Sequence, residues 1–165
     1  RDLRMSRGLG DVYKRQVLVH ADTKDYDHPE PAELCYSMAR TVCRRLEEKA
    51  VSYRFAANAA FDLLLNAALS GEEWRKPLET PQGYGPEHYR RVLEILGRAT
   101  GQTALSCARF CAEYYHPQEQ VGCIVVTTEP EEAVRAAVQP LPGIPLLVLT
   151  PEMAVEMAQT GEAGA

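Results

Sequence analysis

The sequence predicts one α/β domain with a mostly parallel, open β-sheet that is covered by helices on both faces. Short apolar runs, the clearest at residues 17–21 and Val121–Thr127, are typical of strands buried on both faces. Between these runs lie segments in which apolar residues recur three and four positions apart, the spacing of amphipathic helices. Strands that alternate with helices form parallel sheets, because each crossover helix lies against one face of the sheet.

The first strand and the first helix follow directly from this pattern. Residues 17–21 form an apolar run that ends at Asp22, and we expect His20 within it to be a hydrogen-bonded core residue. Pro31 suits the first turn of a helix, since the N–H that proline lacks would have no helical partner there. The apolar stripe of that helix ends near Lys49 and consists of Leu34, Cys35, Met38, Val42 and Leu46.

The middle of the chain is less regular. Residues 51–56 alternate between apolar and polar side chains, which predicts a second strand. Residues 61–69 are compatible with either a strand or a helix, whereas residues 70–85 are rich in glycine and proline and predict a long loop. A second helix begins at Pro86, with its inward-facing residues at Tyr89, Val92, Leu93, Leu96 and Ala99.

The C-terminal third alternates between helices and strands. Proline marks several boundaries, because it starts helices well and cannot continue them. The predicted elements are a helix at residues 104–115, a strand at Val121–Thr127, a short helix at residues 130–138, a strand at residues 144–149, and a terminal helix or tail at residues 151–165.

Residues 1–16 do not read as natural protein sequence. Residues 6–16 match the conceptual translation of a transposase-based sequencing adapter. Such a segment is set aside in fold reasoning, as a fusion scar would be. We therefore expect native sequence to begin at about Val17, in a reading frame already in progress, and the domain to span residues 17–150 of a longer parent protein.

The net charge excludes some classes of partner. The chain holds 18 Lys and Arg against 23 Asp and Glu, and without residues 1–16 these counts are 13 and 21, a net charge of −8. Surfaces for nucleic acid or anionic lipid need basic side chains that displace counterions, so the acidity argues against both. No apolar run approaches the roughly 18 residues of a membrane span, so we expect this part of the chain to be soluble.

The cysteines and serines give little sign of nucleophilic chemistry. Five cysteines without a C-x-x-C pair favour a reducing compartment over a disulfide framework. Cys107 and Cys111 share a helix face, where we interpret them as core packing rather than a metal pair. No G-x-S-x-G nucleophile elbow occurs.

A candidate site follows from the predicted sheet. In open α/β sheets, ligands bind beyond the carboxyl ends of the strands, at the point where the strand order reverses. Polar residues follow three predicted strands, and a glycine loop before the second helix is expected to reach the same edge. The candidate residues are Asp22, Thr23, Lys24, Asp25, Asn58, Gly83, Gly85, His88, Thr127, Thr128 and Glu129.

Several segments together resemble a von Willebrand factor A-type domain, and more narrowly the C-terminal portion of the bacterial family called domain of unknown function fifty-eight. The resembling segments are residues 21–23, 33–40, 53–59 and 83–99, of which the glycine loop with His88 is the most specific. This resemblance implies a three-layer, Rossmann-like fold. It also implies a membrane-anchored parent with two spans, carrying this domain on the cytoplasmic face and working with a MoxR-type ATPase.

The same resemblance implies a metal site that this chain has altered. Von Willebrand A-type domains hold Mg²⁺ with a D-x-S-x-S motif after the first strand, and here Asp22 is kept while Lys24 and Tyr26 replace the serines. A lysine ammonium opposes a divalent cation directly. We therefore expect a degenerate site without a bound metal or other cofactor, in which Lys24 pairs with Asp22 or Glu129. Asp22 remains the one candidate ligand should Mg²⁺ bind.

Two functions follow as hypotheses. The preferred one is a non-enzymatic protein-interaction module whose partner engages the candidate site. The alternative is a divalent-metal-dependent binder or hydrolase that uses the acidic loop after the first strand, formed by Asp22, Asp25, Asp27, Glu30 and Glu33. The alternative predicts that Mg²⁺ or Mn²⁺ at a hundred times its Kd stabilises the fold by about 2.7 kcal/mol.

Overall fold

The computed structural model describes residues 14–59, 76–99 and 101–156. The elements within these ranges are β1 (Lys14–His20), α2 (Glu30–Glu48), β2 (Tyr53–Ala57), β3 (Leu78–Glu79), α4 (Pro86–Arg98), α5 (Cys107–Tyr114), β4 (Val121–Thr127), α6 (Glu131–Ala137) and β5 (Leu146–Leu149). Residues 151–156 are also helical, which confirms the start of the predicted terminal helix. None of the helices in the described ranges is long and apolar enough to span a membrane.

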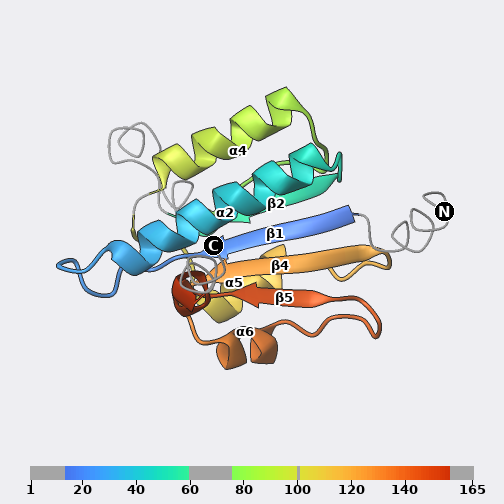
Figure 1. The fold of residues 1–165 in the computed structure, drawn as a ribbon. Helices are drawn as coiled ribbons and strands as arrows, with labels where there is room; N and C mark the ends of the chain where they lie inside the picture. Colours follow the sequence, from blue (N-terminus) through green and yellow to red (C-terminus); the bar gives the residue numbers. More distant parts are fainter. Residues whose placement is uncertain (1–13, 60–75, 100, 157–165) are drawn as a thin grey trace.

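The strands form one mostly parallel sheet in the order β3-β2-β1-β4-β5, with β1 at its centre (Figure 1). β1 pairs in parallel with β2 on one side and with β4 on the other, and β4 pairs in parallel with β5. The short strand β3 runs antiparallel to β2 at the edge of the sheet. The predicted α/β class with a mostly parallel sheet is therefore confirmed.

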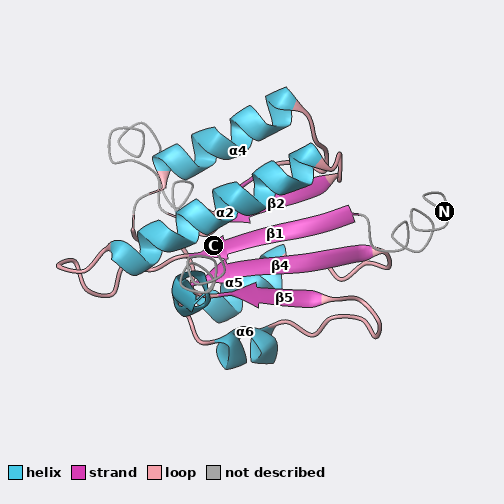
Figure 2. Ribbon diagram, in the orientation of Figure 1, coloured by secondary structure: helices cyan, strands magenta, loops and turns pink. Residues whose placement is uncertain are grey.

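Helices cover both faces of the sheet, as predicted (Figure 2). On one face, α2 and α4 pack over alternate side chains of β1 and β2, including Val17, Val19 and Phe55. On the other face, α5 and α6 pack over Leu18 and Val125. Successive strand residues thus feed two separate hydrophobic cores, because side chains alternate between the two faces of a strand.

Helix α2 turns to the sheet a face that is rotated from its predicted apolar stripe. Its buried residues are Ala32, Cys35, Ala39, Cys43 and Leu46, whereas the larger Met38 and Val42 are only partly buried. Small side chains let the helix axis approach the sheet closely, and the larger ones then fill the flanks beside it. The same rotation affects α4, where His88 and Val92 are buried and Leu93, predicted to face inward, is 38% exposed.

Strand β1 begins at Lys14, three residues before its predicted start. Arg15 and Gln16 pair with both neighbouring strands. The side chain of Gln16 is buried, accepts a hydrogen bond from the backbone N–H of His116 at 3.0 Å, and donates one to the carbonyl oxygen of the same residue. Gln16 therefore fixes the chain just before β4 to the amino end of β1.

Strands β2 and β5 each begin two residues after their predicted starts, two further elements differ more from the predictions, and one prediction falls outside the described ranges. Strand β3 lies within the stretch predicted to be a loop, because two residues are too few to show an alternating pattern. Helix α5 begins at Cys107 rather than Ala104. The N–H groups of Ala104 and Leu105 instead donate to the side chain of Asn58, which follows β2. The ambiguous residues 61–69 lie outside the described ranges.

Candidate functional site

The strand order places a topological switch point at the carboxyl ends of β1 and β4. These strands are neighbours, yet the chain leaves β1 for α2 on one face and leaves β4 for α6 on the other. Loops that diverge in this way open a crevice at the edge of the sheet, where α/β proteins bind their ligands. We call the polar residues gathered there the carboxyl rim: Asp22, Thr23, Lys24, Asp25, Asn58, Thr127, Thr128 and Glu129.

Backbone hydrogen bonds lock the two loops of the carboxyl rim together. The N–H of Thr128 donates to the carbonyl of His20 at 3.1 Å, which extends the β1–β4 pairing by one step. In return, the hydroxyl of Thr128 accepts the N–H of Asp22 at 3.0 Å. The hydroxyl of Thr127 accepts the N–H of Glu129 at 3.0 Å, which fixes the direction in which Glu129 leaves the strand.

A chain of polar side chains runs from the exposed surface into the core. The Nζ atom of Lys24 lies 3.1 Å from Oε1 and 3.2 Å from Oε2 of Glu129. The same Oε1 lies 3.8 Å from Nε2 of His20, whose Nδ1 lies 2.7 Å from Nδ2 of Asn58. Of the two partners predicted for Lys24, the structure confirms Glu129.

The contact with Asn58 fixes the tautomer of His20. The amide nitrogen of Asn58 is a donor only, so Nδ1 of His20 accepts and its proton lies on Nε2, facing Glu129. His20 is 2% exposed, which confirms that it is a hydrogen-bonded core residue. An imidazole held neutral between an amide and a carboxylate carries a fixed dipole from the core toward the surface.

Asn58 connects this series of polar side chains to the segment that precedes α5. Its Oδ1 accepts the backbone N–H groups of Ala104 at 3.1 Å and Leu105 at 3.0 Å, and its Nδ2 also donates to the carbonyl of Leu105 at 2.8 Å. Because Asn58 is 1% exposed, it supports the carboxyl rim from below and offers no surface to a partner. Sequence reasoning found the residue but not these contacts, which join positions far apart in the chain.

A second contact, which sequence reasoning missed, brings Gly101 against the carboxyl rim. The N–H of Thr23 donates to the carbonyl of Gly101 at 2.7 Å. A Cβ atom at position 101 would lie 2.2 Å from Oγ1 and 2.9 Å from Cβ of Thr23, so only glycine fits. Next to it, Nε2 of Gln102 donates to the hydroxyl of Tyr26 at 3.2 Å, although the Tyr26 side chain is largely exposed.

The glycine loop does not belong to the carboxyl rim, contrary to the prediction. Gly83 exchanges backbone hydrogen bonds of 2.9 and 3.1 Å with Tyr53, the first residue of β2. Because β3 is antiparallel to β2, the chain that leaves β3 returns to the amino end of the sheet. Gly83, Gly85 and His88 therefore lie at the edge opposite the carboxyl rim.

At that opposite edge these residues form a structural cluster. The carboxylate of Glu47 accepts the hydroxyl of Tyr53 at 2.8 Å and the N–H of Gly85 at 2.7 Å. Gly85 has φ +121°, a conformation that favours glycine. The His88 ring meets the Tyr53 ring edge to face at 4.6 Å, and burial lowers the pKa of His88. The cluster anchors the start of α4 to β2.

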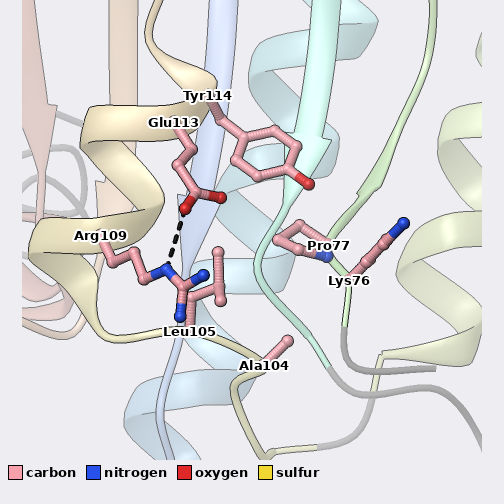
Figure 3. A pocket seen from close by; sticks show the side chains of 7 residues that line it. All are labelled: Lys76, Pro77, Ala104, Leu105, Arg109, Glu113 and Tyr114. Atoms are coloured by element: carbon pink, nitrogen blue, oxygen red, sulfur yellow. Dashed lines mark hydrogen bonds and ion pairs between the residues drawn. The ribbon is translucent and has the colours of Figure 1, made fainter. Parts of the chain in front are cut away.

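A cavity of about 420 Å³ lies beside the Asn58-bound segment, outside the carboxyl rim (Figure 3). Figure 3 shows Arg109 and Glu113 of α5 facing Lys76 and Pro77 across the opening. The Nε atom of Arg109 is bound to Oε1 of Glu113 at 2.8 Å, so the two charges satisfy each other. The cavity is lined by Lys76, Pro77, Ala104, Leu105, Arg109, Glu113 and Tyr114, among which there is no histidine, cysteine or aspartate.

The position of His20 predicts that acid weakens the fold. Burial lowers the pKa of His20 from its usual 6.5, an effect that Glu129 and Asp22 oppose and Lys24 reinforces. Below about pH 6.5 the unfolded chain therefore binds a proton that the folded chain refuses, and stability falls until the pKa of the folded state is reached. His88, whose pKa is lowered in the same direction, adds to this loss.

Urea unfolding at about pH 7.5 and about pH 5.5 measures this effect, because most carboxylates stay ionised across that interval. We expect the wild-type chain to be less stable at the lower pH, and His20→Gln and His88→Gln each to reduce the difference. Equal stability of the wild-type chain at both values would contradict the prediction.

Comparison of the chain with protein-family models, with curated proteins and with solved structures gave no match. The α/β architecture is shared by proteins of many unrelated activities, so the fold alone does not identify one. Function has to be inferred from the geometry of the carboxyl rim.

Proposed function

We propose that the chain is a protein-interaction module of the von Willebrand A type, in which an internal ion pair replaces the metal ion. The central position of β1 and the switch point between β1 and β4 support this assignment, because both put Asp22 where the resembling domains begin their metal motif. Within the ion pair with Glu129, the Lys24 ammonium supplies a positive charge at the same edge. The exposed residues of the carboxyl rim are then a rigid surface that a partner protein recognises, whereas Asn58 and Thr127 are buried beneath it.

The side chains of the carboxyl rim do not fit Mg²⁺. This ion requires near-octahedral oxygen ligands, and both carboxylate oxygens of Glu129 already lie within 3.2 Å of the Lys24 ammonium. Among the described residues, no three His, Cys, Asp or Glu side chains converge in the manner of metal ligands. In this proposal the Lys24 ammonium stands beside Glu129 in place of a metal ion.

Tyr26 is the observation that carries the proposal. It stands in the loop after β1 and is 73% exposed, between Asp25 and Asp27, which are also exposed. An aromatic side chain ringed by charged groups is the composition of interface hot spots, in which one anchor fills a pocket of the partner. The acidic surroundings favour a partner with a basic surface around that pocket.

The loop that carries Tyr26 is held in shape before any partner arrives. Oδ1 of Asp25 accepts the N–H of Asp27 at 3.0 Å, and the backbone carbonyl of Asp25 accepts the N–H of His28 at 3.0 Å. Lys24 on one side is tied to Glu129, and Tyr26 itself accepts a hydrogen bond from Gln102. A pre-organised loop loses less conformational entropy on binding, so more of the contact energy remains as affinity.

The family resemblance supplies a candidate partner, a MoxR-type ATPase. We expect Tyr26→Ala to weaken its binding to the immobilised chain by about thirtyfold or more, the loss expected when an anchor worth about 2 kcal/mol is removed. The matched control is Tyr84→Ala, because Tyr84 is 55% exposed but lies beside Gly83 at the opposite edge. We expect that variant to bind as the wild-type chain does.

Two results would argue against the proposal. Equal binding by both tyrosine variants and the wild-type chain would show that the loop of Tyr26, next to the carboxyl rim, does not anchor the partner. Stabilisation of the chain by Mg²⁺ or Mn²⁺ in a melting experiment, abolished by Asp22→Ala, would favour the metal-dependent alternative instead. A circular dichroism spectrum of each variant verifies that the fold is intact.

A further inference from the structure

The two edges of the sheet differ in how they discourage pairing with another strand. Strand β3 forms one edge with two residues and lies between Pro77 and Pro81. It also carries Glu79, whose carboxylate lies 3.6 Å from the guanidinium of Arg54. Short edge strands, prolines and charged side chains all oppose edge-to-edge pairing. At the other edge, β5 has no charged side chain (Figure 1). The edge at β5 is therefore the one open to a further strand.

Half of the backbone hydrogen-bonding groups of β5 point away from the sheet. The N–H and carbonyl of one residue point to the same side of a strand, and the side alternates from residue to residue. The N–H of Cys123 in β4 donates to the carbonyl of Pro145 at 3.1 Å, so Leu147, two residues later, also faces β4. The backbone groups of Leu146 and Val148 point outward, where the described residues supply no strand to pair with them.

The Leu147 side chain adds an apolar contact at the same edge. Leu146 and Val148 pack in the core that α5 and α6 cover, so Leu147 points to the opposite face of the sheet. Leu147 is 51% exposed on that face, where α2 and α4 pack over β1 and β2. An exposed leucine between unpaired backbone groups suits contact with another apolar strand.

We propose that β5 pairs with β5 of a second copy of this chain, antiparallel about a two-fold axis at Leu147. Leu146 of each copy then lies opposite Val148 of the other, and the two residues of each pair exchange both backbone hydrogen bonds. Leu147 lies opposite Leu147 of the second copy in a pair without hydrogen bonds, whose Cα atoms are about 4.5 Å apart. The two leucine side chains therefore meet on the same face of a continuous sheet.

The charges of α6 fit the same axis. Helix α6 connects two parallel neighbouring strands, so it runs antiparallel to β5. Nη2 of Arg135 donates to the carbonyl of Leu146 at 3.3 Å, which places Arg135 beside the edge. Glu131 lies about 6 Å further toward the carboxyl end of β5, one turn earlier on the helix. Rotation about Leu147 therefore brings Arg135 level with Glu131 of the second copy.

A second copy suits this edge better than a strand of unrelated sequence. Self-pairing uses the outward groups of Leu146 and Val148 at once and places the acidic end of each α6 beside the basic end of the other. A carbonyl oxygen has two lone pairs, so the bond from Arg135 leaves Leu146 able to accept a second one. One short strand is at the small end of protein interfaces, so the dimer should depend on concentration.

Sedimentation velocity of the full chain between about 10 µM and about 1 mM tests the proposal. We expect the wild-type chain to pass from monomer to dimer across this range. Leu147→Lys should raise the Kd of the dimer at least about tenfold, because two ammonium groups would face each other across the axis. The matched control is Leu93→Lys, since Leu93 is 38% exposed on α4, and it should dimerise as the wild-type chain does.

The register of the pairing has its own test. Mild oxidation of Leu147→Cys should join two copies through a disulfide at position 147, because the opposed Cβ atoms lie about 4.5–5.5 Å apart, close to the span of a disulfide. The control is Leu141→Cys, a 37% exposed position before β5 and away from the axis, for which we expect little cross-linking. Peptide mapping distinguishes a link at position 147 from links through the five native cysteines.

The cross-linking result decides the question even where Leu147→Lys fails to fold. A wild-type chain that stays monomeric at every concentration, or a dimer that a folded Leu147→Lys leaves unchanged, would overturn the proposal. Equal cross-linking at positions 141 and 147 would overturn the two-fold axis at Leu147. Neither assay uses a partner protein, so their outcomes are independent of the interaction proposed for the carboxyl rim.

Discussion

Asn58→Ala is expected to lower the free energy of unfolding by about 3–5 kcal/mol. The Asn58 side chain makes four hydrogen bonds, with the His20 ring, with the N–H and carbonyl of Leu105, and with the N–H of Ala104. Removing it leaves these groups without their partner next to the core, and each buried polar group without a partner costs about 1–3 kcal/mol. Some of this loss is recovered where water enters.

Urea unfolding of Asn58→Ala measures this loss at constant pH. The matched control is Gln82→Ala, which also removes a side-chain amide, but one whose hydrogen bond to Ser52 lies on the surface. We expect Gln82→Ala to change stability by less than about 0.5 kcal/mol. Similar values for both variants would show that the segment before α5 does not depend on Asn58.

Phe110→Ala is expected to cost about 3–5 kcal/mol as well, for a different reason. The Phe110 side chain is fully buried between α5 and the sheet, where it packs in the same cluster as Leu18 and Val125. Its ring is stacked on Tyr114 at 5.2 Å and lies 6.3 Å from the ring of His20. Alanine would leave a cavity beneath His20, since the surrounding strands cannot collapse into it.

The denaturant midpoint of Phe110→Ala gives this cost, and Phe110→Leu grades it. Leucine refills most of the cavity, so we expect a loss below about 1.5 kcal/mol for that variant. Leu93→Ala is the surface control, because Leu93 is 38% exposed on α4, and it should cost much less. A small loss for Phe110→Ala would mean that α5 contributes little to the second core.

These two variants separate the local support of the carboxyl rim from the stability of the whole domain. Three of the four hydrogen bonds of Asn58 hold the segment before α5, so its loss is expected to free residues 101–106 before the sheet unfolds. Phe110 belongs to the core shared by α5 and β4, and its loss weakens the sheet as a unit. Hydrogen exchange at Leu105 and at Val125 distinguishes the two effects, since the Asn58 variant should accelerate exchange at Leu105 more than at Val125, whereas the Phe110 variant should accelerate both to a similar degree.

Part of the candidate site could be predicted from local sequence. Strand β4 has the predicted bounds, because seven consecutive residues buried on both faces require an apolar run. The residues after β1 and β4 then meet at the edge of the sheet by topology alone. Lys24 could be given a carboxylate partner for the same reason, although the choice between Asp22 and Glu129 depended on the direction that Thr127 imposes on the loop.

Other parts of the site could not be predicted, because they depend on contacts between distant residues. The glycine loop with His88 was assigned to the carboxyl rim, and the two residues of β3 reversed the chain and carried it to the opposite edge. Helix α5 was predicted to begin at Ala104, but the N–H of Ala104 donates to the side chain of Asn58 and the residue lies outside the helix. Neither the reversal at β3 nor the contact of Ala104 with Asn58 leaves a sign in the local pattern of apolar residues.

The α/β class, the order of the main strands and helices, and the polar character of the loops after β1 and β4 could all be read from the sequence. Apolar periodicity is a local property, and burial on one or two faces dictates it directly. Three features depend on the folded molecule: which loops share an edge of the sheet, which face of α2 is buried, and how the side chains of His20, Asn58 and Glu129 contact one another in series. Strand direction, helix rotation and side-chain pairing are set by packing between elements, which no single segment encodes.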